Sequence, residues 1–495
     1  MMPAPDTLPA RIDAIPRAAA ARTPDAPALR EGARSVTYRE LAGEIDRYAD
    51  LLRARGVRPG DRVLLVSENC VAQVALIFAA SSIDAWIVPV NPRLSAPEVD
   101  GIRVHCGARL ALYTADVSPE AAAHAARAGA LPWGGVMAGP VDEHAVPEAV
   151  AGDAVAALIY TTGTTGQPKG VMLSHRNLLF VAQTSSRLRG LVPQDRAWGV
   201  LPVSHVYGLT SVLLGTLCAG ACLHLVPRFT PEAMLRAIRD EGLSIVQGVP
   251  AMYARLLELA GSGSLPSTLR FAYAGGSPLD PDLKRRVEAL LGLPLHNGYG
   301  LTEAAPTVSQ TRLDAPRADT SVGLPIPGVE VRIVDRTGAD VANGTAGELW
   351  VRGPNVMRGY YRAPDLSAAA LRADGWLNTG DMAYRAPDGA LFIVGRTKEL
   401  IIRSGFNVFP LEVETVLNAH PGVTQSAVVG KAVADGNEEV VAFVQRDPGQ
   451  SVGVDALREW AAARLAPYKR PARIVLMQAL PAAATGKILK HLLKE

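Results

Sequence analysis

A run of threonines and glycines ending in one lysine follows the apolar segment Val155–Tyr160. Glycines let backbone N–H groups approach an anion, threonine hydroxyls add further donors, and the lysine adds positive charge. The spacing is not that of the Walker loop, because no Gly-Lys-Ser/Thr follows four residues after a glycine. We predict a phosphate-binding loop of another type, with a plain polar turn between strands as the alternative. The candidate residues are Thr161, Thr162, Gly163, Thr164, Thr165, Gly166 and Lys169.

The segment Asn297–Glu303 combines groups that suit a nucleotide. The Asn297 amide can hydrogen-bond the edge of a base, and the Tyr299 ring offers a flat face on which a base can stack. A glycine stands on each side of Tyr299. This pattern favours a turn that faces a ligand over a core aromatic residue.

His205 is an imidazole within the apolar segment Leu201–Gly208, and a hydrogen-bonded core histidine is the ordinary interpretation of such a residue. Cys218, Cys222 and His224 lie close by in the sequence and could suggest zinc. A fourth ligand is not evident and the neighbouring residues are apolar, so we expect buried thiols instead.

Five separated segments together resemble the adenylate-forming superfamily, which contains acyl-CoA synthetases, nonribosomal adenylation domains and beetle luciferases. They follow the family's order and are Thr161–Gly170, Asn297–Glu303, Asn378–Asp381, Gly395–Glu399 and Ala484–Lys487. The resemblance implies an AMP-forming acyl-CoA synthetase that uses ATP, Mg²⁺ and coenzyme A. A carboxylic acid would attack ATP to give acyl-adenylate and pyrophosphate, and the CoA thiolate would then displace AMP.

The same resemblance implies the fold class, which is α/β. A large N-terminal domain of parallel-rich sheets sandwiched by helices would hold ATP and the acid, and a small mobile α+β domain would close over it. We expect the large domain to span residues 1–397 and the small one residues 398–495. Lys398 matches the family's hinge position, so a rotation there would separate the two half-reactions.

Roles carry over to individual residues by resemblance. Lys487 matches the catalytic lysine, whose charge would offset the repulsion between the attacking carboxylate and the α-phosphate. Thr302 would lie against that phosphate, and Glu303 would hold Mg²⁺, a hard cation that favours carboxylate oxygen. His205 would border the acyl pocket and orient the carboxylate. The residues implied around ATP and CoA also include Gly275, Asn297, Gly298, Tyr299, Gly300, Asp381, Arg396, Ser404 and Gly405.

The identity of the acid is less defined. Gly298 stands where malonate-specific relatives carry arginine, and the tryptophan of acetate enzymes is absent, which leaves an apolar acid of moderate or greater size. The segment Ile402–Glu414 looks most like fatty-acyl members and favours a medium- or long-chain fatty acid, with an aryl acid as the alternative. A second functional class considered for the chain is a nucleotide-binding protein of the same fold that has no catalytic activity. The joint presence of Lys169, Glu303 and Lys487 argues against it.

The elements that would position these residues alternate between strand and helix in the first third of the chain. Thr37 and Glu40 form a capping box ahead of a helical repeat of apolar residues. Buried strands are expected at Arg62–Val66, Trp86–Val90 and Arg109–Tyr113, and the alternation favours a parallel sheet. Residues 116–152 are rich in Ala, Gly and Pro and are expected to form a surface excursion.

The C-terminal segment reads as a small α+β unit. Strands are expected at Ala427–Val429, Val440–Gln445 and Arg473–Met477, and helices at Leu411–Ala419 and Val454–Leu465.

Length and composition exclude several classes of protein. The 495 residues suggest two to four domains, and 50 basic against 48 acidic residues leave a net charge of +2, so no nucleic-acid partner is expected. Four cysteines cannot build a disulfide framework, and the N-terminus lacks the apolar core of a signal peptide, so a cytoplasmic location is expected.

One stretch between Arg196 and Arg228 lacks charged residues, which raises the alternative of a membrane transporter. Proline, glycine and polar residues interrupt it, so we expect a buried strand, loop and core helix and no stable membrane insertion. Two questions stay open: whether Lys487 is switched by a lysine acetyltransferase and deacetylase or is never modified, and whether the chain forms a homodimer.

Overall fold

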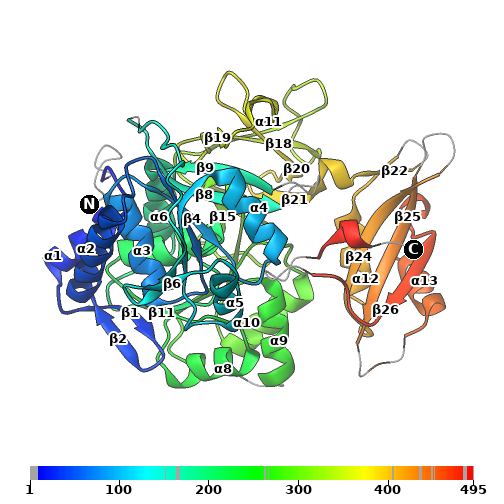
Figure 1. The fold of residues 1–495 in the computed structure, drawn as a ribbon. Coiled ribbons are helices and arrows are strands. Elements are labelled where there is room, and N and C mark those ends of the chain that lie inside the picture. Colours follow the sequence, from blue (N-terminus) through cyan, green and yellow to red (C-terminus); the bar gives the residue numbers. More distant parts are fainter. Residues whose placement is uncertain are drawn as a thin grey trace.

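The computed structural model describes residues 9–150, 152–162, 168–260, 264–265, 267–403, 406–433, 438–447, 450, 452–482 and 488–493. Two large sheets with helices packed around them build the main body, a smaller antiparallel sheet lies beside them, and an α+β lobe follows at the C-terminal end (Figure 1). This arrangement confirms the predicted α/β class, with a large N-terminal and a smaller C-terminal domain.

An eight-stranded sheet carries the predicted phosphate-binding segment. Its central strands pair in parallel and are buried along their whole length, as their runs of apolar residues predicted. The strand order is β19 (Gly359–Tyr360), β9 (Pro168–Ser174), β8 (Val155–Thr162), β4 (Trp86–Val90), β3 (Arg62–Val66), β5 (Ala108–Tyr113), β7 (Val136–Ala138) and β6 (Leu131–Trp133).

The helix that leads into the first of these central strands begins at the expected cap. Thr37 and Glu40 form the predicted capping box of α2 (Tyr38–Ala54), and the apolar stripe of this helix is buried. The connections to the next strands are α3 (Val71–Ser82) and α4 (Ala96–Cys106). Residues 116–152 are more regular than predicted, since they contain α5 (Pro119–Arg127) and the hairpin β6–β7, which pairs antiparallel with β5.

A nine-stranded sheet carries the predicted nucleotide-binding segment. Six neighbouring strands in its middle pair in parallel, and antiparallel strands close both edges. The strand order is β16 (Leu324–Pro325), β15 (Thr307–Gln310), β14 (Leu295–Gly300), β13 (Phe271–Ala274), β12 (Ile245–Gly248), β10 (Arg196–Gly199), β11 (Cys222–Leu225), β1 (Pro27–Glu31) and β2 (Arg34–Thr37).

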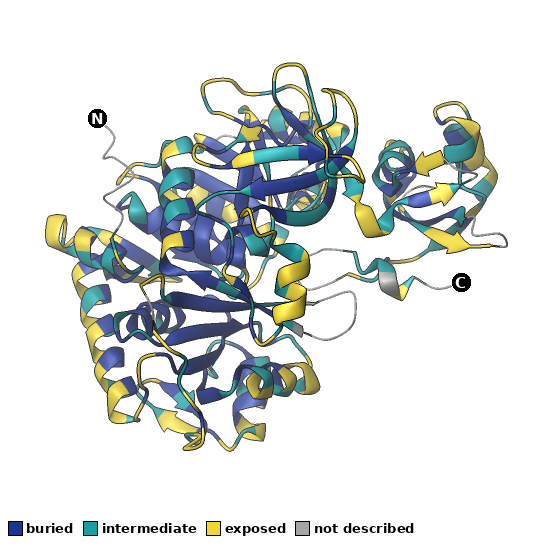
Figure 2. Ribbon diagram, turned by 90° about the horizontal axis from the view of Figure 1, so that it is seen from above, coloured by how far each residue is buried: buried dark blue, intermediate teal, exposed yellow. Residues whose placement is uncertain are grey.

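The largest buried apolar cluster joins residues from both large sheets with the helices between them, so the core lies where the sheets face one another (Figure 2). The charge-free stretch after Arg196 is part of this core. It forms β10, a loop, the buried helical segments η2 (Tyr207–Leu214) and α7 (Gly215–Cys218), and then β11, as predicted. The other helices of this half are α1 (Ala14–Arg22), α6 (His175–Leu188), α8 (Pro231–Asp240), α9 (Pro250–Ala260), α10 (Pro281–Leu291) and the short η3 (Thr302–Ala304).

A four-stranded antiparallel sheet follows the second large sheet in the chain. The helix α11 (Pro364–Ala370) precedes its third strand, and the short helix η4 (Thr397–Glu399) follows its last strand. The strand order is β17 (Glu330–Val334), β18 (Gly347–Arg352), β20 (Leu377–Arg385) and β21 (Leu391–Arg396).

The C-terminal lobe has its own buried apolar cluster and the α+β composition that the sequence predicted. Its elements are β22 (Ile401–Arg403), β23 (Phe406–Val408), α12 (Pro410–Asn418), β24 (Val423–Ala432), β25 (Glu438–Arg446), α13 (Val454–Ala462), η6 (Pro467–Lys469), β26 (Arg473–Met477) and η7 (Lys490–Leu492).

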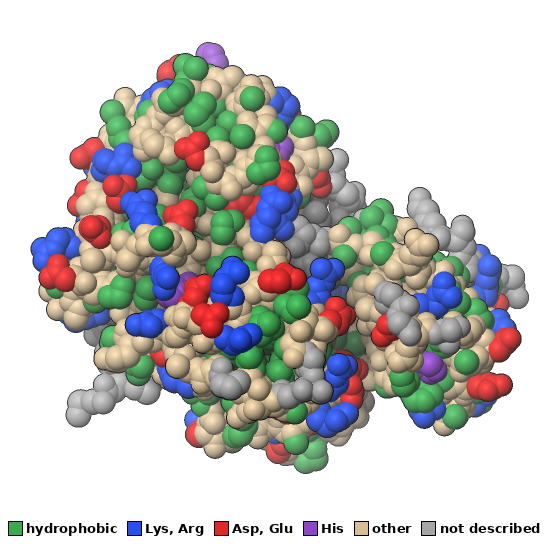
Figure 3. Space-filling model, turned by 90° about the horizontal axis from the view of Figure 1, so that it is seen from below, with side chains coloured by type: hydrophobic (Ala, Val, Ile, Leu, Met, Phe, Trp, Pro, Cys, Tyr) green, Lys and Arg blue, Asp and Glu red, His purple; other side chains and the backbone are tan. Residues whose placement is uncertain are grey.

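Two features of the described residues concern membrane spans and surface charge. Among the described residues, no helix is long and apolar enough to cross a membrane. Acidic and basic side chains are interspersed over the face shown in Figure 3, with no large patch of one sign.

Candidate active site

The hairpin β8–β9 presents the predicted phosphate-binding segment. Thr161 pairs with Lys169 across the hairpin, and Gly170 pairs with Tyr160. The loop residues Gly163, Thr164, Thr165 and Gly166 lie outside the described residues, as does the side chain of Thr162. Lys169 is half-buried, and its Nζ lies 5.5 Å from the centre of the Tyr360 ring.

Tyr360 connects this lysine to the predicted metal ligand. Its hydroxyl donates a hydrogen bond of 2.8 Å to Oε1 of Glu303. Burial, and then the neighbouring Glu303 carboxylate, raise the pKa of Tyr360 well above its usual value, so the hydroxyl stays protonated and can donate. The structure thus brings Lys169, Tyr360 and Glu303 together, with Thr302 buried beside Glu303 in η3.

Tyr360 was not identified from the sequence. It lies in the two-residue strand β19, whose pairing with β9 places it next to Lys169 in space although the two are far apart in the chain. Its only local signal is the preceding Gly359, a pattern too common to be specific.

Glu303 fits a magnesium ion that is shared with phosphates. In the described part of the chain, no group of three or more His, Cys, Asp or Glu side chains could hold a metal ion by itself. Mg²⁺ keeps several waters and is usually held by one or two carboxylates together with substrate phosphates. A single half-buried carboxylate beside a phosphate-binding segment suits this mode of binding.

A second group of predicted residues meets at the four-stranded sheet. The Tyr299 hydroxyl donates a hydrogen bond to Oδ2 of Asp381, and the Arg396 Nε lies 3.4 Å from Oδ1 of the same carboxylate. Asp381 and Arg396 are direct partners in the β20–β21 register. Burial is the main cause that raises the pKa of Tyr299, so this hydroxyl also remains a donor.

The glycines of this region are required by close packing. A Cβ added at Gly298 would lie 1.9 Å from the Tyr273 hydroxyl, and one at Gly300 would lie 2.3 Å from the carbonyl oxygen of Pro306. At Gly275 the nearest atom, Cε1 of Tyr273, would be 3.1 Å away. Steric exclusion of a side chain therefore explains Gly298 and Gly300 before any ligand is considered, whereas the contact at Gly275 is tight but less severe.

Asn297 is buried, and both hydrogens of its amide are engaged. They donate to the carbonyl oxygens of Thr320 at 3.1 Å and Ser321 at 3.3 Å, and Oδ1 accepts from the Gly298 N–H at 2.9 Å. The side chain thus fixes the loop at Thr320 and Ser321, and the base contact expected from the sequence stays a prediction.

His205 is exposed and is therefore not a core histidine. Its Nδ1 accepts a hydrogen bond of 3.3 Å from the Tyr207 N–H at the start of η2. The segment before it is held by buried Asn69, whose amide group donates to the carbonyl oxygens of Gly199 and Leu201, both at 2.9 Å. Sequence inspection did not identify Asn69, because a lone asparagine after a strand carries no specific signal.

The zinc alternative is not supported by the structure. His224 lies 3.5 Å from the Glu241 carboxylate, and Cys222 is buried and free. Burial raises the pKa of the Cys222 thiol to about 11, which disfavours the thiolate that zinc requires.

Three further predicted residues, Lys487, Ser404 and Gly405, also lie outside the described residues. The described chain resumes just after Lys487, at residue 488, and continues into η7. There the Lys490 Nζ lies 2.9 Å from Oε2 of Glu399 and 2.8 Å from Oε1 of Glu414. Lys490 therefore joins the C-terminal segment to η4 and to α12.

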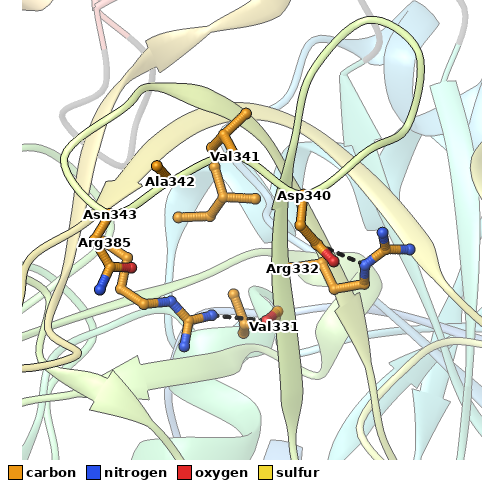
Figure 4. A pocket seen from close by; sticks show the side chains of 8 residues that line it. Val331, Arg332, Asp340, Val341, Ala342, Asn343 and Arg385 are labelled. Carbon is orange, nitrogen blue, oxygen red and sulfur yellow. Dashed lines mark hydrogen bonds and ion pairs between the residues drawn. The ribbon is translucent and has the colours of Figure 1, made fainter.

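A separate surface hollow lies away from these residues, over β17 and the end of β20 (Figure 4). Its two arginines are engaged locally, because Arg332 Nε donates to Asp340 at 2.8 Å and Arg385 donates to the Val331 carbonyl oxygen at 2.8 Å. This hollow shares no residue with the predicted site.

Comparison with known families decides the assignment. The family model described as AMP-binding enzyme matches residues 16–361, and the model of the AMP-binding enzyme C-terminal domain matches residues 412–487. The chain belongs to the AMP-binding enzyme family.

Individual members of the family resemble this AMP-binding enzyme over nearly its whole length. A feruloyl-CoA synthase of an Amycolatopsis species is 38% identical over 471 residues, which cover 94% of this chain and 95% of that protein. ATP-bound MatB from Rhodopseudomonas palustris has a TM-score of 0.86 at 31% identity, with 97% of this chain and 98% of that chain covered.

A third relative is known with a metal ion. The o-succinylbenzoate CoA synthetase MenE from Bacillus subtilis, in complex with ATP and magnesium, has a TM-score of 0.84 at 29% identity and covers 97% of this chain and 99% of that chain. The prediction of an AMP-forming acid–thiol ligase that uses ATP, Mg²⁺ and CoA is confirmed by these relatives.

Proposed function

We propose that this AMP-binding enzyme is an aryl acid–CoA ligase whose substrate is an aromatic acid of the cinnamate type. The observation that carries the proposal is the 38% identity to a feruloyl-CoA synthase over almost the whole chain. It favours the aryl alternative over the medium- or long-chain fatty acid that the sequence favoured.

Aromatic side chains next to the predicted nucleotide-binding residues support an aromatic acid. The rings of Tyr207 and Tyr273 lie 6.3 Å apart in an edge-on arrangement. A Cβ added at Gly275 would lie 3.4 Å from the Tyr207 hydroxyl and 3.1 Å from Tyr273. Edge-to-face contacts with such rings suit a flat aromatic acid better than a flexible alkyl chain.

The adenylation step needs positive charge at a centre already ringed with phosphate oxygens. Lys169 and Lys487 would supply that charge from the chain, and Glu303, oriented by Tyr360, would hold Mg²⁺. When bound, the metal ion neutralises phosphate charge and orients the phosphates. Tyr299, Asp381 and Arg396 would fix the nucleoside so that the acid carboxylate meets the α-phosphorus in line.

The thioester step requires Lys487 to leave and the CoA thiol to enter. We place the pivot at Lys398, within η4, and the domain boundary between residues 397 and 398. The strand β21 ends at Arg396, so η4 is the first element after the four-stranded sheet and leads directly into the C-terminal lobe. A rotation at this junction would move the lobe as a unit.

A pyrophosphate-release screen tests the proposed function. Ferulate, 4-coumarate, cinnamate, benzoate, octanoate and palmitate are each supplied with MgATP, with and without CoA, and thioester is measured separately. We expect the cinnamate-type acids to give the highest kcat/KM and CoA-dependent thioester. A preference for octanoate or palmitate would support a fatty acid as the substrate instead. Pyrophosphate release without thioester formation would contradict the assignment as a CoA ligase.

The matched control is Glu303→Gln, which removes the carboxylate charge but keeps the shape of the side chain. We expect this variant to lose pyrophosphate release with every acid, since the same metal site serves them all. Pyrophosphate release that survives in purified Glu303→Gln would contradict the proposed metal-binding role of Glu303.

A further inference from the structure

Arg189, at the C-terminal end of α6, is a buried cation with no acidic partner. Its side chain is 1% exposed, and Nη1 donates to Oε1 of Gln247 at 2.5 Å and to the carbonyl oxygen of Ser211 at 3.3 Å. The guanidinium carbon lies 4.4 Å from the centre of the Tyr273 ring. Among the described residues, no carboxylate comes within ion-pair distance of it.

A second buried arginine shows what a purely structural guanidinium looks like in this protein. Arg62 is 0% exposed, and each of its three nitrogens donates to backbone carbonyl oxygens at 2.8 or 2.9 Å. Arg189 instead leaves its buried Nε without a partner in the described part of the chain. A buried charge that is neither paired nor fully hydrogen-bonded is costly, so this donor requires another explanation.

Other buried donors around Arg189 are also unpartnered. The Gln247 Nε2 and the Tyr207 hydroxyl are buried and find no hydrogen-bond partner among the described residues. Gln247 accepts from Arg189, so its amide nitrogen necessarily faces away from that contact. Three donors from α6, β12 and η2 thus lie in one region and lack an acceptor.

These donors lie next to the predicted reaction site. Tyr273, on which Arg189 stacks, is two residues before Gly275 on the strand end, and its hydroxyl would contact a Cβ placed at Gly298. Tyr207 also borders Gly275, since its hydroxyl would lie 3.4 Å from a Cβ added there. The donor cluster therefore lies close to the strand ends that carry the predicted nucleotide-binding residues.

We propose that Arg189, together with Gln247 and Tyr207, binds an acceptor oxygen at the end of the acid remote from its reacting carboxylate. This inference rests on the proposed function and narrows the substrate class to aromatic acids with a ring-borne oxygen. That oxygen belongs to a hydroxyl group or to a second carboxylate. An unsubstituted aromatic acid would leave the donors unpaired, and a site of this kind rejects the analogue that lacks the bonding group.

The test compares three acids that differ only in the para substituent of the ring: 4-hydroxycinnamate, 4-carboxycinnamate and cinnamate. The quantity measured is kcat/KM for CoA thioester formation by the full-length enzyme and by Arg189→Met. We expect the wild type to prefer one of the oxygen-bearing acids, and the acid that is preferred identifies the source of the oxygen. In Arg189→Met we expect that preference to fall about 10- to 100-fold, the range of a lost hydrogen bond to a charged group.

Arg187→Met is the matched control, because Arg187 is exposed two residues earlier on the same helix and should leave the preference unchanged. Gln247→Met provides a second variant and should reduce the preference in the same direction. If the oxygen-bearing acids and cinnamate lose activity equally in Arg189→Met, or if the wild type favours cinnamate, the proposal is overturned.

Urea unfolding separates a binding role from a structural one. Removing an unpaired buried charge should leave the unfolding midpoint of Arg189→Met equal to or above that of the wild type, whereas Arg62→Met should lower it. An unfolded Arg189→Met would make Arg189 structural and overturn the proposal. A wild type inactive on all aryl acids would instead contradict the proposed function itself, a result distinct from an unchanged preference.

Discussion

The hydroxyl group of Tyr360 has one evident task, which is to hold the Glu303 carboxylate through a hydrogen bond of 2.8 Å. The ring itself packs near Lys169, so removing the hydroxyl alone should leave the packing intact. At this scale the site depends on side chains that orient the charged groups, and each such side chain can be removed singly.

For Tyr360→Phe we expect the Mg²⁺ concentration for half-maximal pyrophosphate release to rise about tenfold, because a hydrogen bond to a charged group contributes about 1.5–3 kcal/mol. The measurement is a Mg²⁺ titration at saturating ATP and acid. Tyr361→Phe serves as control, since the Tyr361 hydroxyl bonds Glu148 instead. An unchanged Mg²⁺ requirement in Tyr360→Phe would show that the Tyr360 hydroxyl does not contribute to metal binding.

His175, the first residue of α6, makes the stability of the protein depend on pH. Burial lowers its pKa from 6.5 to about 4, and its Nδ1 accepts a hydrogen bond from the Ile12 N–H. Between these two values the unfolded chain binds a proton that the folded protein does not bind. Stability is therefore full above the unfolded pKa and falls as the pH drops from about 6.5 toward 4.

We expect the free energy of unfolding to fall by about 2 kcal/mol between pH 7 and pH 5 because of this histidine. In His175→Asn, whose side-chain oxygen can still accept from Ile12, that part of the pH dependence should disappear. Urea unfolding at both pH values measures it, with the exposed His144→Asn as control. Equal pH dependence in wild type and His175→Asn would show that the histidine is not buried in the neutral form.

Among the elements, those with strong periodicity were predictable. The strand Arg62–Val66 is an unbroken apolar run after its first residue, and α2 has both its capping box and its apolar stripe in the sequence. The four-stranded antiparallel sheet was not predicted, because strands such as β20 are mostly half-exposed and alternate irregularly. Tyr360 and Arg189 were missed for a related reason: contacts across the chain, and not local patterns, define their roles.

The short helix η4 is the element on which the second half-reaction is expected to depend. Proline fixes φ and restricts the residue before it, so Lys398→Pro should hinder rotation at this junction. We expect normal pyrophosphate release and at least a tenfold loss of thioester formation in this variant, measured as two separate assays. Lys398→Ala is the control that loses the charge without fixing the backbone. Intact thioester formation in the proline variant would place the pivot elsewhere.

For the whole molecule, we expect the loss of Lys487 to affect the first half-reaction and to spare the second. In the proposed mechanism its charge is needed only while the carboxylate attacks phosphorus, so Lys487→Ala should abolish acyl-adenylate formation. Thioester formation from synthetic acyl-adenylate and CoA should be largely retained. Equal loss in both assays would mean that the substitution disturbs the lobe or CoA binding and not the chemical step.

The ion pairs of Lys490 have a mechanical consequence for this cycle. Because Lys490 forms ion pairs with Glu399, beside the proposed pivot, and with Glu414 on α12, the chain after residue 487 is tied to both of these elements. A rotation at η4 would therefore move the terminal segment together with α12. We therefore expect the junction at η4 to control the change from the first half-reaction to the second.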